Sequence, residues 1–212
     1  GASARGIAVV PPTISEAELK RLDTDGFVGI RLNFSTFNIR DPEEARKQIL
    51  DIVPKLEPLN WHIQINTELP MIAGLASTIV VLPVPVVFDH IGNPSAELGA
   101  AQPGFFALMD LVHSGNAYVK LSAPYNHSQR ADWADVTPLA KSLIGARADR
   151  CLWGTNWPHP GGTRGAISQI SPYQVIDNPR LMAAFMEWCP DPAMQKMILV
   201  DTPARLYRFP RA

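Results

Sequence analysis

The sequence predicts a single α/β domain built around a parallel β-sheet, and three observations support this. Short runs rich in β-branched and aromatic residues alternate with helix-type stretches along the 212 residues. Gly, Pro, Asn or Asp bounds each run, as at strand ends, and no change in composition marks a linker. We therefore expect one domain over residues 1–212, made of repeated strand–helix units. The six predicted strands are residues 5–10, 27–34, 61–66, 86–90, 117–122 and 150–154.

Helices are expected between these strands and after the last one. The first helix has the clearest start, because Ser15 can cap its N-terminus while Glu18 completes a capping box three residues later. A late helix is expected at about residues 178–188, and residues 193–200 lead into the C-terminal tail. The helices predicted between strands are residues 15–22, 42–55, about 71–81, 103–113 and 137–144.

The order of side chains inside the strands predicts a curved sheet with a polar interior. In the third run, Trp61, Ile63 and Ile65 occupy one face, as expected for a strand that helices cover on its outside. This is the alternation of a (β/α)₈ barrel, whose active site lies at the carboxyl ends of the strands. An open doubly wound sheet would also bind ligands there, but no glycine-rich phosphate loop supports it. The predicted inward side chains are Arg31, Asn33, His62, Gln64, Asn66, Lys120 and Ser122.

Composition excludes several classes of partner. With 19 basic and 20 acidic side chains and no block of like charge, we expect neither a nucleic-acid partner nor an anionic membrane surface. The most apolar stretch, residues 71–88, is interrupted by a glycine and two prolines, which argues against a membrane-spanning helix. No signal peptide is evident, and Cys151 and Cys189 form no CxxC motif, so we expect a cytoplasmic protein.

The densest chemical signal is the segment Phe-Asp-His-Ile-Gly at residues 88–92. His90 is expected to project into the cavity from the end of its strand. A histidine there can ligate a metal, donate a hydrogen bond to an oxyanion or move a proton near neutral pH. The alternative is a ring that a neighbour at the barrel mouth simply satisfies.

A second signal is the segment Leu-Trp-Gly-Thr-Asn-Trp-Pro-His-Pro at residues 152–160. Asn156 is expected just past a strand end, where its amide can position a water or a substrate oxygen but cannot act as a general base. The alternatives are a turn-capping amide for Asn156 and a solvent-side ring for His159.

A third signal is the segment Tyr-Val-Lys-Leu-Ser-Ala-Pro-Tyr-Asn at residues 118–126. Lys120 is expected inside the barrel, with Ser122, Tyr125 and Asn126 at its mouth. Lys120 can bind an anionic substrate or form a buried ion pair with a barrel carboxylate, and the other runs show no inward acidic partner. No GxSxG or HExxH motif supports a serine esterase or a zinc protease.

These three segments and the tail Ile-Leu-Val-Asp-Thr-Pro-Ala-Arg-Leu-Tyr at residues 198–207 resemble the amidohydrolase-related TIM-barrel hydrolases of the amidohydrolase 2 type. This family includes 2-pyrone-4,6-dicarboxylate lactonases and galactarolactone isomerases. The resemblance covers almost the whole chain. It implies a hydrolase of the metal-dependent hydrolase fold type that opens a lactone or related ester C–O bond by attack of water on the carbonyl.

The resemblance also implies which parts of that barrel are present. The six runs correspond to barrel strands three to eight. Strands one and two, with the family's HxH histidine pair and roughly 80 residues, are then expected to lie outside this chain, which would hold a barrel truncated at its N-terminus to about six units.

Residue by residue, the resemblance assigns His90 and Asn156 as the catalytic candidates. His90 matches the active-site histidine after the sixth strand, and Asn156 stands where the family commonly has an aspartate base or metal ligand. Without that aspartate and the HxH pair we expect no bound metal and no cofactor. Asn93 and Asn126 stand where the dicarboxylate enzymes carry arginines, which argues against a dicarboxylate substrate. The substrate-binding candidates are Arg31, His62, Gln64, Asn93, Lys120, Ser122, Tyr125, Asn126 and His159.

Two other functions remain open on the sequence. The chain could be a catalytically inactive partial barrel with a structural or binding role, or a metal-dependent decarboxylase of the same superfamily. A sheet of six parallel strands has two open edges, which favours a homo-oligomer in either case. For the enzyme we expect a small-molecule substrate.

Overall fold

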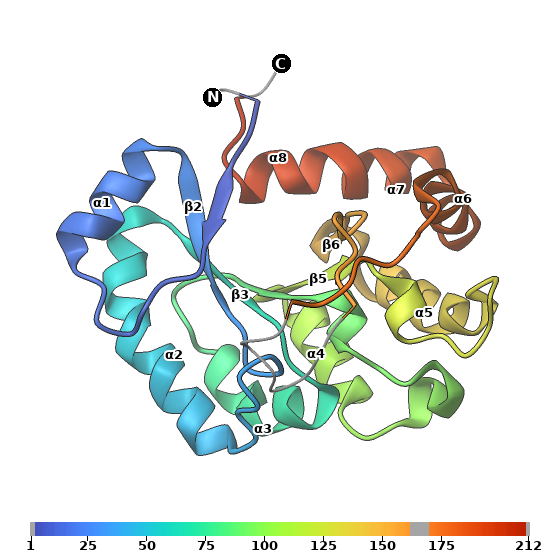
Figure 1. Ribbon diagram of the computed structural model, residues 1–212, viewed down its shortest axis with the longest axis horizontal. Coiled ribbons are helices and arrows are strands. Elements are labelled where there is room, and N and C mark those ends of the chain that lie inside the picture. The colour runs from blue at the N-terminus through green and yellow to red at the C-terminus, as the bar shows by residue number, and fades with distance from the viewer. Residues whose placement is uncertain (1–2, 162–169, 211–212) are drawn as a thin grey trace.

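The computed structural model describes residues 3–161 and 170–210. Its six strands form one parallel sheet in sequence order, so each strand pairs with the next one along the chain. Figure 1 shows the sheet curling around an interior, with helices on its outer side. All six predicted strands are confirmed, although each is shorter than predicted. The strands are β1 (Gly6–Ala8), β2 (Phe27–Leu32), β3 (His62–Ile65), β4 (Val86–Phe88), β5 (Ala117–Leu121) and β6 (Cys151–Trp153).

The predicted helices are also present. At the first of them, the Ser15 hydroxyl accepts from the Glu18 backbone N–H at 3.2 Å and the Glu18 carboxylate accepts from the Ser15 N–H at 3.0 Å, which confirms the capping box. The α-helices are α1 (Glu16–Thr24), α2 (Pro42–Leu56), α3 (Leu69–Ile79), α4 (Phe105–Ser114), α5 (Thr137–Arg147), α6 (Asn178–Trp188), α7 (Pro192–Lys196) and α8 (Thr202–Leu206). A π-helical turn, Met197–Asp201, joins α7 to α8, and 3₁₀ turns lie at Glu57–Leu59, His90–Gly92, Ala96–Ala101, Pro124–Asn126, Ala134–Val136 and Ala148–Arg150.

The alternation predicted for β3 is confirmed by burial. Trp61, Ile63 and Ile65 are fully buried in the main core, between the sheet and its covering helices. The indole N–H of Trp61 donates to Asp23 at 2.7 Å, so the one polar atom of this core side chain is satisfied. His62 and Gln64 face the opposite, interior side and are also buried.

The C-terminal segment closes part of the interior, which differs from the tail expected after residue 200. The chain continues through the π-helical turn into α8. Pro203 does not interrupt it, because proline in the first turn of a helix costs no hydrogen bond. Leu206 then packs in a small cluster with the inward side chains Val87, Tyr118 and Leu152. The ring of Tyr207 meets His62 edge-on, with ring centroids 5.4 Å apart.

Arg208 ties the end of the chain to the start of the sheet. Its guanidinium donates to Asp23 and to the Leu59 carbonyl, at 3.0 Å each. Arg5, just before β1, donates to the Arg208 carbonyl at 3.0 Å and stacks over the Phe209 ring. These contacts hold the end of the chain beside β1, as Figure 1 shows.

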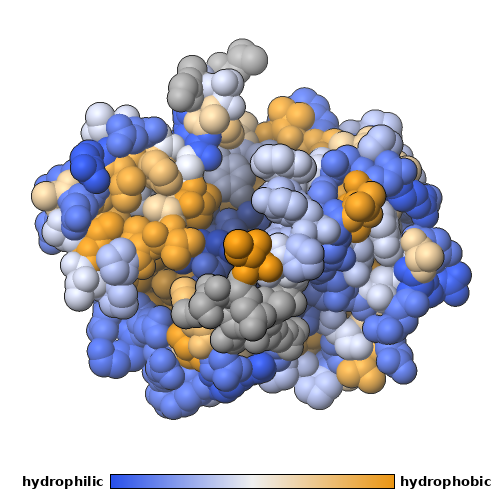
Figure 2. All heavy atoms as spheres, viewed as in Figure 1, coloured by the Kyte–Doolittle hydropathy of each residue, from blue (hydrophilic) through white to orange (hydrophobic). Residues whose placement is uncertain are grey.

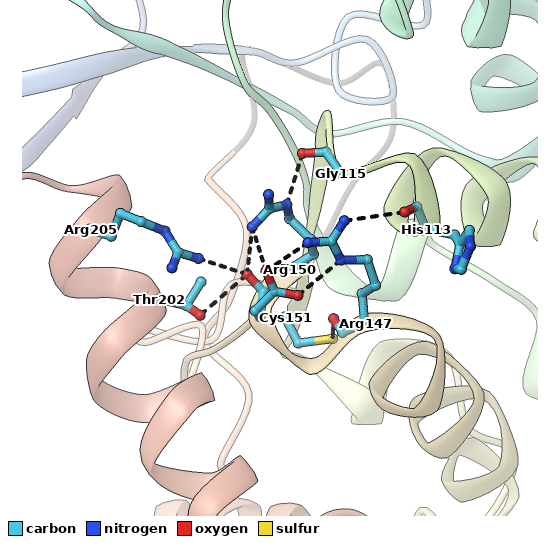
Figure 3. Close-up of polar contacts among 8 residues, drawn as sticks. His113, Gly115, Arg147, Arg150, Cys151, Thr202 and Arg205 are labelled. Atoms are coloured by element: carbon cyan, nitrogen blue, oxygen red, sulfur yellow. Dashed lines mark hydrogen bonds and ion pairs between the residues drawn. The ribbon is translucent and has the colours of Figure 1, made fainter.

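A second polar cluster, around Asp149, anchors the start of β6 (Figure 3). The Asp149 carboxylate accepts from Arg147 and Arg150, and its backbone carbonyl accepts from Thr202 and Arg205. Arg147 also donates to the backbone carbonyl of His113 near the end of α4, and Arg150 donates to the backbone carbonyl of Gly115 just after that helix. The cluster therefore joins α4, α5, β6 and α8 at one end of the sheet.

None of the helices in the described part of the chain combines the length and the apolar character that crossing a membrane requires.

Gly29 provides a test of how tightly the interior is packed. A methyl group at Gly29 would lie 2.6 Å from the His62 carbonyl oxygen and 2.9 Å from Cε1 of its ring. We expect Gly29→Ala to destabilise the protein by about 1–3 kcal/mol, because backbone and ring must both move. Urea unfolding followed by circular dichroism measures this.

The matched control is Gly145→Ala in α5, where an added methyl group meets nothing within 4 Å. We expect it to stabilise the helix by about 0.5–1 kcal/mol, because alanine loses less backbone entropy than glycine. Equal effects of the two substitutions would contradict the close packing of His62 on Gly29.

Candidate functional site

The interior of the sheet is organised around Asp89, the residue that follows β4. Its carboxylate is 1% exposed. Arg31 on β2 contacts one carboxylate oxygen through both Nε and Nη2, at 2.8 Å each. Gln64 on β3 donates to the same oxygen at 3.0 Å. Two neighbouring strands, β2 and β3, thus place polar groups on the charge that follows β4.

Lys120 on β5 completes this network. Its ammonium donates to the side-chain oxygen Oε1 of Gln64 at 2.8 Å and lies 3.5 Å from the second oxygen of Asp89. The ion pair considered for Lys120 is therefore present, with Asp89 as the carboxylate that the sequence had not revealed. Burial raises the pKa of Asp89, but the charges of Lys120, His90 and Arg31 outweigh it, so the pKa lies below its ordinary value.

Asp89 is the functional residue that sequence reasoning missed. The signal was available, because Val87 faces the interior and the alternation of β4 carries Asp89 to the same side.

His90 does not lie on the strand, contrary to the prediction for residues 86–90. The ladder ends at Phe88, and His90 begins a 3₁₀ turn with a left-handed backbone, φ 52°. This turn swings the ring toward the end of β5, where Nδ1 lies 3.0 Å from the Ser122 hydroxyl. Burial lowers the pKa of His90 to about 4, more than Asp89 raises it, so the ring is neutral at pH 7.

His62 is the first residue of β3, so it lies at the amino end of the strand and away from the carboxyl ends. It is 1% exposed, and its Nε2 has no hydrogen-bond partner among the described residues. Burial, assisted by the charge of Lys120, lowers the pKa of His62 to about 3. The ring is thus a neutral packing element against Gly29 and Tyr207.

Three of the other candidates form a hydrogen-bonded chain beyond β5 and β6. The Asn156 amide donates to the Tyr125 hydroxyl at 3.0 Å, and that hydroxyl lies 2.9 Å from Nδ1 of His159. A hydroxyl that accepts from Asn156 can donate its own proton to His159. Burial raises the pKa of Tyr125 while the Asn156 hydrogen bond opposes this, so the phenol stays protonated at neutral pH.

The alternative of a solvent-side ring for His159 is wrong. The ring is 5% exposed, because Tyr125 packs against it edge-on with centroids 5.7 Å apart. The left-handed backbone at Asn156 and at His159 turns both side chains back toward the loop after β5.

The remaining two asparagines have mainly local partners. Asn93 donates to Asn66 at 3.0 Å and to the Thr67 carbonyl at 2.7 Å, which braces the loops after β3 and β4. Asn126 is exposed and accepts from Gln174 at 3.2 Å. The structure therefore pairs His90 with Ser122, links Tyr125 to Asn156 and His159, and leaves Asn126 exposed.

A metal-binding group is not evident in residues 3–161 and 170–210, where no three His, Cys, Asp or Glu side chains are placed to hold an ion.

Comparison with known proteins identifies relatives of this chain. A family model described as amidohydrolase matches residues 1–209. The chain is 31% identical to the 2-pyrone-4,6-dicarbaxylate hydrolase of Comamonas testosteroni, over 98% of this chain and 68% of that protein. It is 28% identical to the 4-sulfomuconolactone hydrolase of Hydrogenophaga intermedia, over 95% of this chain and 64% of that protein. The chain thus spans about two thirds of the length of these curated relatives.

Solved structures show the same fold. A crystal structure from Pseudomonas putida superposes with a TM-score of 0.81 at 23% identity, over all of this chain and 74% of that one. An amidohydrolase from Burkholderia multivorans with bound zinc superposes with a TM-score of 0.71 at 14% identity, over 98% of this chain and 74% of that one.

The Asp89 network yields a stability prediction. Asp89→Asn removes the only negative charge in contact with Arg31 and Lys120 within the described network. We expect a loss of about 3–5 kcal/mol in the free energy of unfolding, because two cations remain partly buried without a counter-charge. Urea titration at pH 7 measures it.

Asp201→Asn serves as the control, since Asp201 pairs with Lys196 at the surface. There the loss should stay below about 1 kcal/mol. If the two variants lose the same stability, the Asp89 network does not hold the interior together.

The imidazoles of His62 and His90 yield a pH prediction. Both have folded-state pKa values, about 3 for His62 and about 4 for His90, below the ordinary 6.5. Between pH 6.5 and pH 4 the two imidazoles are therefore protonated in the unfolded chain but neutral in the folded protein. The contribution of the two neutral rings to the free energy of unfolding is fully present above pH 6.5. It falls as the pH drops, by up to about 1.4 kcal/mol per pH unit for each ring.

Urea unfolding at pH 7, 6 and 5 measures this slope in the parent and in His62→Gln, which should show about half of it. His113→Gln, which removes an exposed histidine from α4, should keep the parent slope. A parent stability that is constant from pH 7 to pH 5 would falsify the prediction.

Proposed function

The chain belongs to the amidohydrolase family, and we propose that its strand-end site hydrolyses a lactone or related ester. Water attacks the carbonyl carbon, the ring C–O bond breaks, and the product is a hydroxy acid. One observation carries the proposal: side chains from the ends of β4, β5 and β6 are hydrogen-bonded to one another around the loop that contains Ser122 and Tyr125. The names of both curated relatives above describe hydrolases, one of them of a lactone.

His90 is the proposed electrophilic group. If the Ser122 hydroxyl donates to Nδ1, the proton of the neutral ring lies on Nε2, which can donate to the carbonyl oxygen as negative charge develops there. The depressed pKa supports this role, because a neutral imidazole carries the same donor at every pH above about 4.

The proton of the attacking water requires another route, because the amide of Asn156 cannot accept it as a base. We assign it to the Tyr125 hydroxyl, which takes the proton as its own proton passes to Nδ1 of His159. Asn156 holds Tyr125 in place through its hydrogen bond. His159 then returns that proton through Tyr125 to the oxygen released when the ring opens, so the reaction balances without a carboxylate.

The proposal also covers the complete barrel, the oligomeric state and the cellular compartment. We propose that the sheet is part of a (β/α)₈ barrel, which the greater length of the relatives supports. We also propose a homo-oligomer, since β1 and β6 each pair with one strand in the described sheet and edge strands readily find partners. The free thiols of Cys151 and Cys189 fit a reducing compartment such as the cytoplasm.

The test is hydrolysis of a panel of five- and six-membered lactones, followed by acid release at constant pH. We expect His90→Gln to lower kcat/KM by about 10²-fold or more, since a positioned donor or acid contributes at least that factor. His113→Gln is the matched control and should leave kcat/KM unchanged.

Asn156→Asp sharpens the assignment. A carboxylate next to Tyr125 adds a general base to the Tyr125–His159 pair, so we expect kcat to rise, whereas Asn156→Ala should lower it. If the parent opens no lactone, or if His90→Gln retains full activity, the proposed function is wrong and the inactive partial barrel becomes the better interpretation.

A further inference from the structure

The polar cluster around Asp149 holds more positive than negative charge. Arg147 and Arg150 both pair with the Asp149 carboxylate, at 2.9 and 2.8 Å. Arg205 on α8 donates to the Asp149 backbone carbonyl at 3.0 Å. No other carboxylate of the described residues contacts these three guanidinium groups, so the cluster has an excess of two positive charges.

The Asp149 carboxylate is itself charged at neutral pH. The hydrogen bond from Arg147, assisted by the charges of Arg150 and Arg205, outweighs burial and holds the pKa of Asp149 below its ordinary value. Arginine also stays protonated, so the excess of positive charge persists throughout the neutral pH range.

Two of the guanidinium groups are held close together. Nη1 of Arg150 and Nη2 of Arg205 donate to the same carbonyl oxygen of Asp149, at 3.1 and 3.0 Å, and Figure 3 shows both side chains pointing toward it. One carbonyl dipole offsets only part of the repulsion between two full charges. An anion that contacts both groups is therefore attracted by both.

Both groups also keep N–H donors for such an anion. Nη2 of Arg150 and the Nε and Nη1 of Arg205 have no partner among the described residues. Nη2 of Arg150 is not one of the fully buried unpaired atoms, and Arg205 is exposed, so solvent reaches both. The guanidinium of Arg150 lies 4.9 Å from the centroid of the Tyr118 ring, which fixes its orientation before an anion binds.

A groove of about 1030 Å³ adjoins this pair of arginines, because Arg205 is part of its lining. Its apolar wall includes Leu199 and Val200, just before α8, and Phe209 after it. Figure 2 shows hydrophobic side chains at the upper edge of the molecule, on the segment that contains α8. The groove is large enough for the organic part of a small molecule, since such pockets span about 300–1,000 Å³.

We propose that Arg150 and Arg205 form a binding site for a dianionic oxyanion, the phosphate group of inorganic phosphate or of a phosphate monoester. Planar guanidinium groups suit an anion with several acceptor oxygens, and a dianion neutralises the excess charge of the cluster. The organic part of a monoester lies in the groove. The site precedes β6, whereas the candidate active site lies beyond the carboxyl ends of the strands, so the inference does not depend on the proposed hydrolysis.

The test is titration calorimetry of the whole chain at pH 8, where phosphate and phenyl phosphate are dianions, with ionic strength held constant by sodium chloride. We expect saturable binding of phosphate and of sulfate, and no measurable binding of the monoanion nitrate. Phenyl phosphate that binds about tenfold or more tightly than phosphate identifies a monoester held in the groove. Equal affinities identify inorganic phosphate as the ligand.

Arg205→Gln removes one of the two guanidinium groups at an exposed position. It should weaken phosphate binding by about tenfold or more, because a charge-assisted contact is lost. Arg130→Gln is the matched control, since Arg130 is 60% exposed and pairs with Asp132 outside the cluster. This variant should bind phosphate as the parent does.

Thermal unfolding gives a second readout that does not depend on the heat of binding. Phosphate stabilises many proteins without binding to a site, so the comparison between variants decides. We expect phosphate to raise the Tm of the parent and of Arg130→Gln by more than that of Arg205→Gln. If phosphate binds the parent no better than nitrate, or if the two variants respond alike, the cluster only ties α8 to β6 and the proposed site is wrong.

Discussion

The interior of this protein depends on one buried carboxylate. Asp89 lies where the curled sheet would otherwise enclose the charges of Arg31 and Lys120 alone, and partly buried cations without a counter-charge are costly. Gln64 bridges the two sides, since it donates to Asp89 and accepts from Lys120. The four side chains come from four neighbouring strands or strand ends, so the network also holds the register that aligns the site above it.

The charges of that network affect the protonation state of His90 in the candidate site. Burial of the His90 ring, together with the charges of Arg31 and Lys120, lowers its pKa and keeps the imidazole neutral, although the adjacent carboxylate acts in the opposite direction. A neutral ring that touches Ser122 suits hydrogen-bond donation better than proton storage. The loop after β5 also supplies Tyr125, which is hydrogen-bonded to Asn156 and His159, so this loop contributes to both parts of the candidate site.

The C-terminal segment fills part of the interior of the curled sheet with its own side chains. Leu206 and Tyr207 pack against the inward side chains of β4, β5 and β6, and Arg208 binds residues near β1 and β2. A helix end therefore fills space between the two edges of the sheet. The C-terminal segment contacts the sheet through side-chain packing and hydrogen bonds and does not pair with it as a strand. The outer edges of β1 and β6 therefore keep backbone groups that can pair with another strand.

The sequence by itself determined the elements and their faces. The capping box at Ser15, the six strands and the inward side of His62 and Gln64 all follow from local periodicity, which depends only on neighbours in the chain. The candidate residues were predicted inside the strands and at their ends, and the family resemblance assigned His90 and Asn156 as catalytic and the others as substrate-binding.

Tertiary structure decided which of these residues meet. That Lys120 pairs with Asp89, that His90 turns back to Ser122 and that His159 is buried beside Tyr125 could not be read from spacing. The partners lie 31 to 34 residues apart in each of these pairs, and left-handed turns at His90, Asn156 and His159 redirect the side chains. Strand periodicity ends where such turns begin, so only the packed fold determines how the residues beyond the strands are arranged.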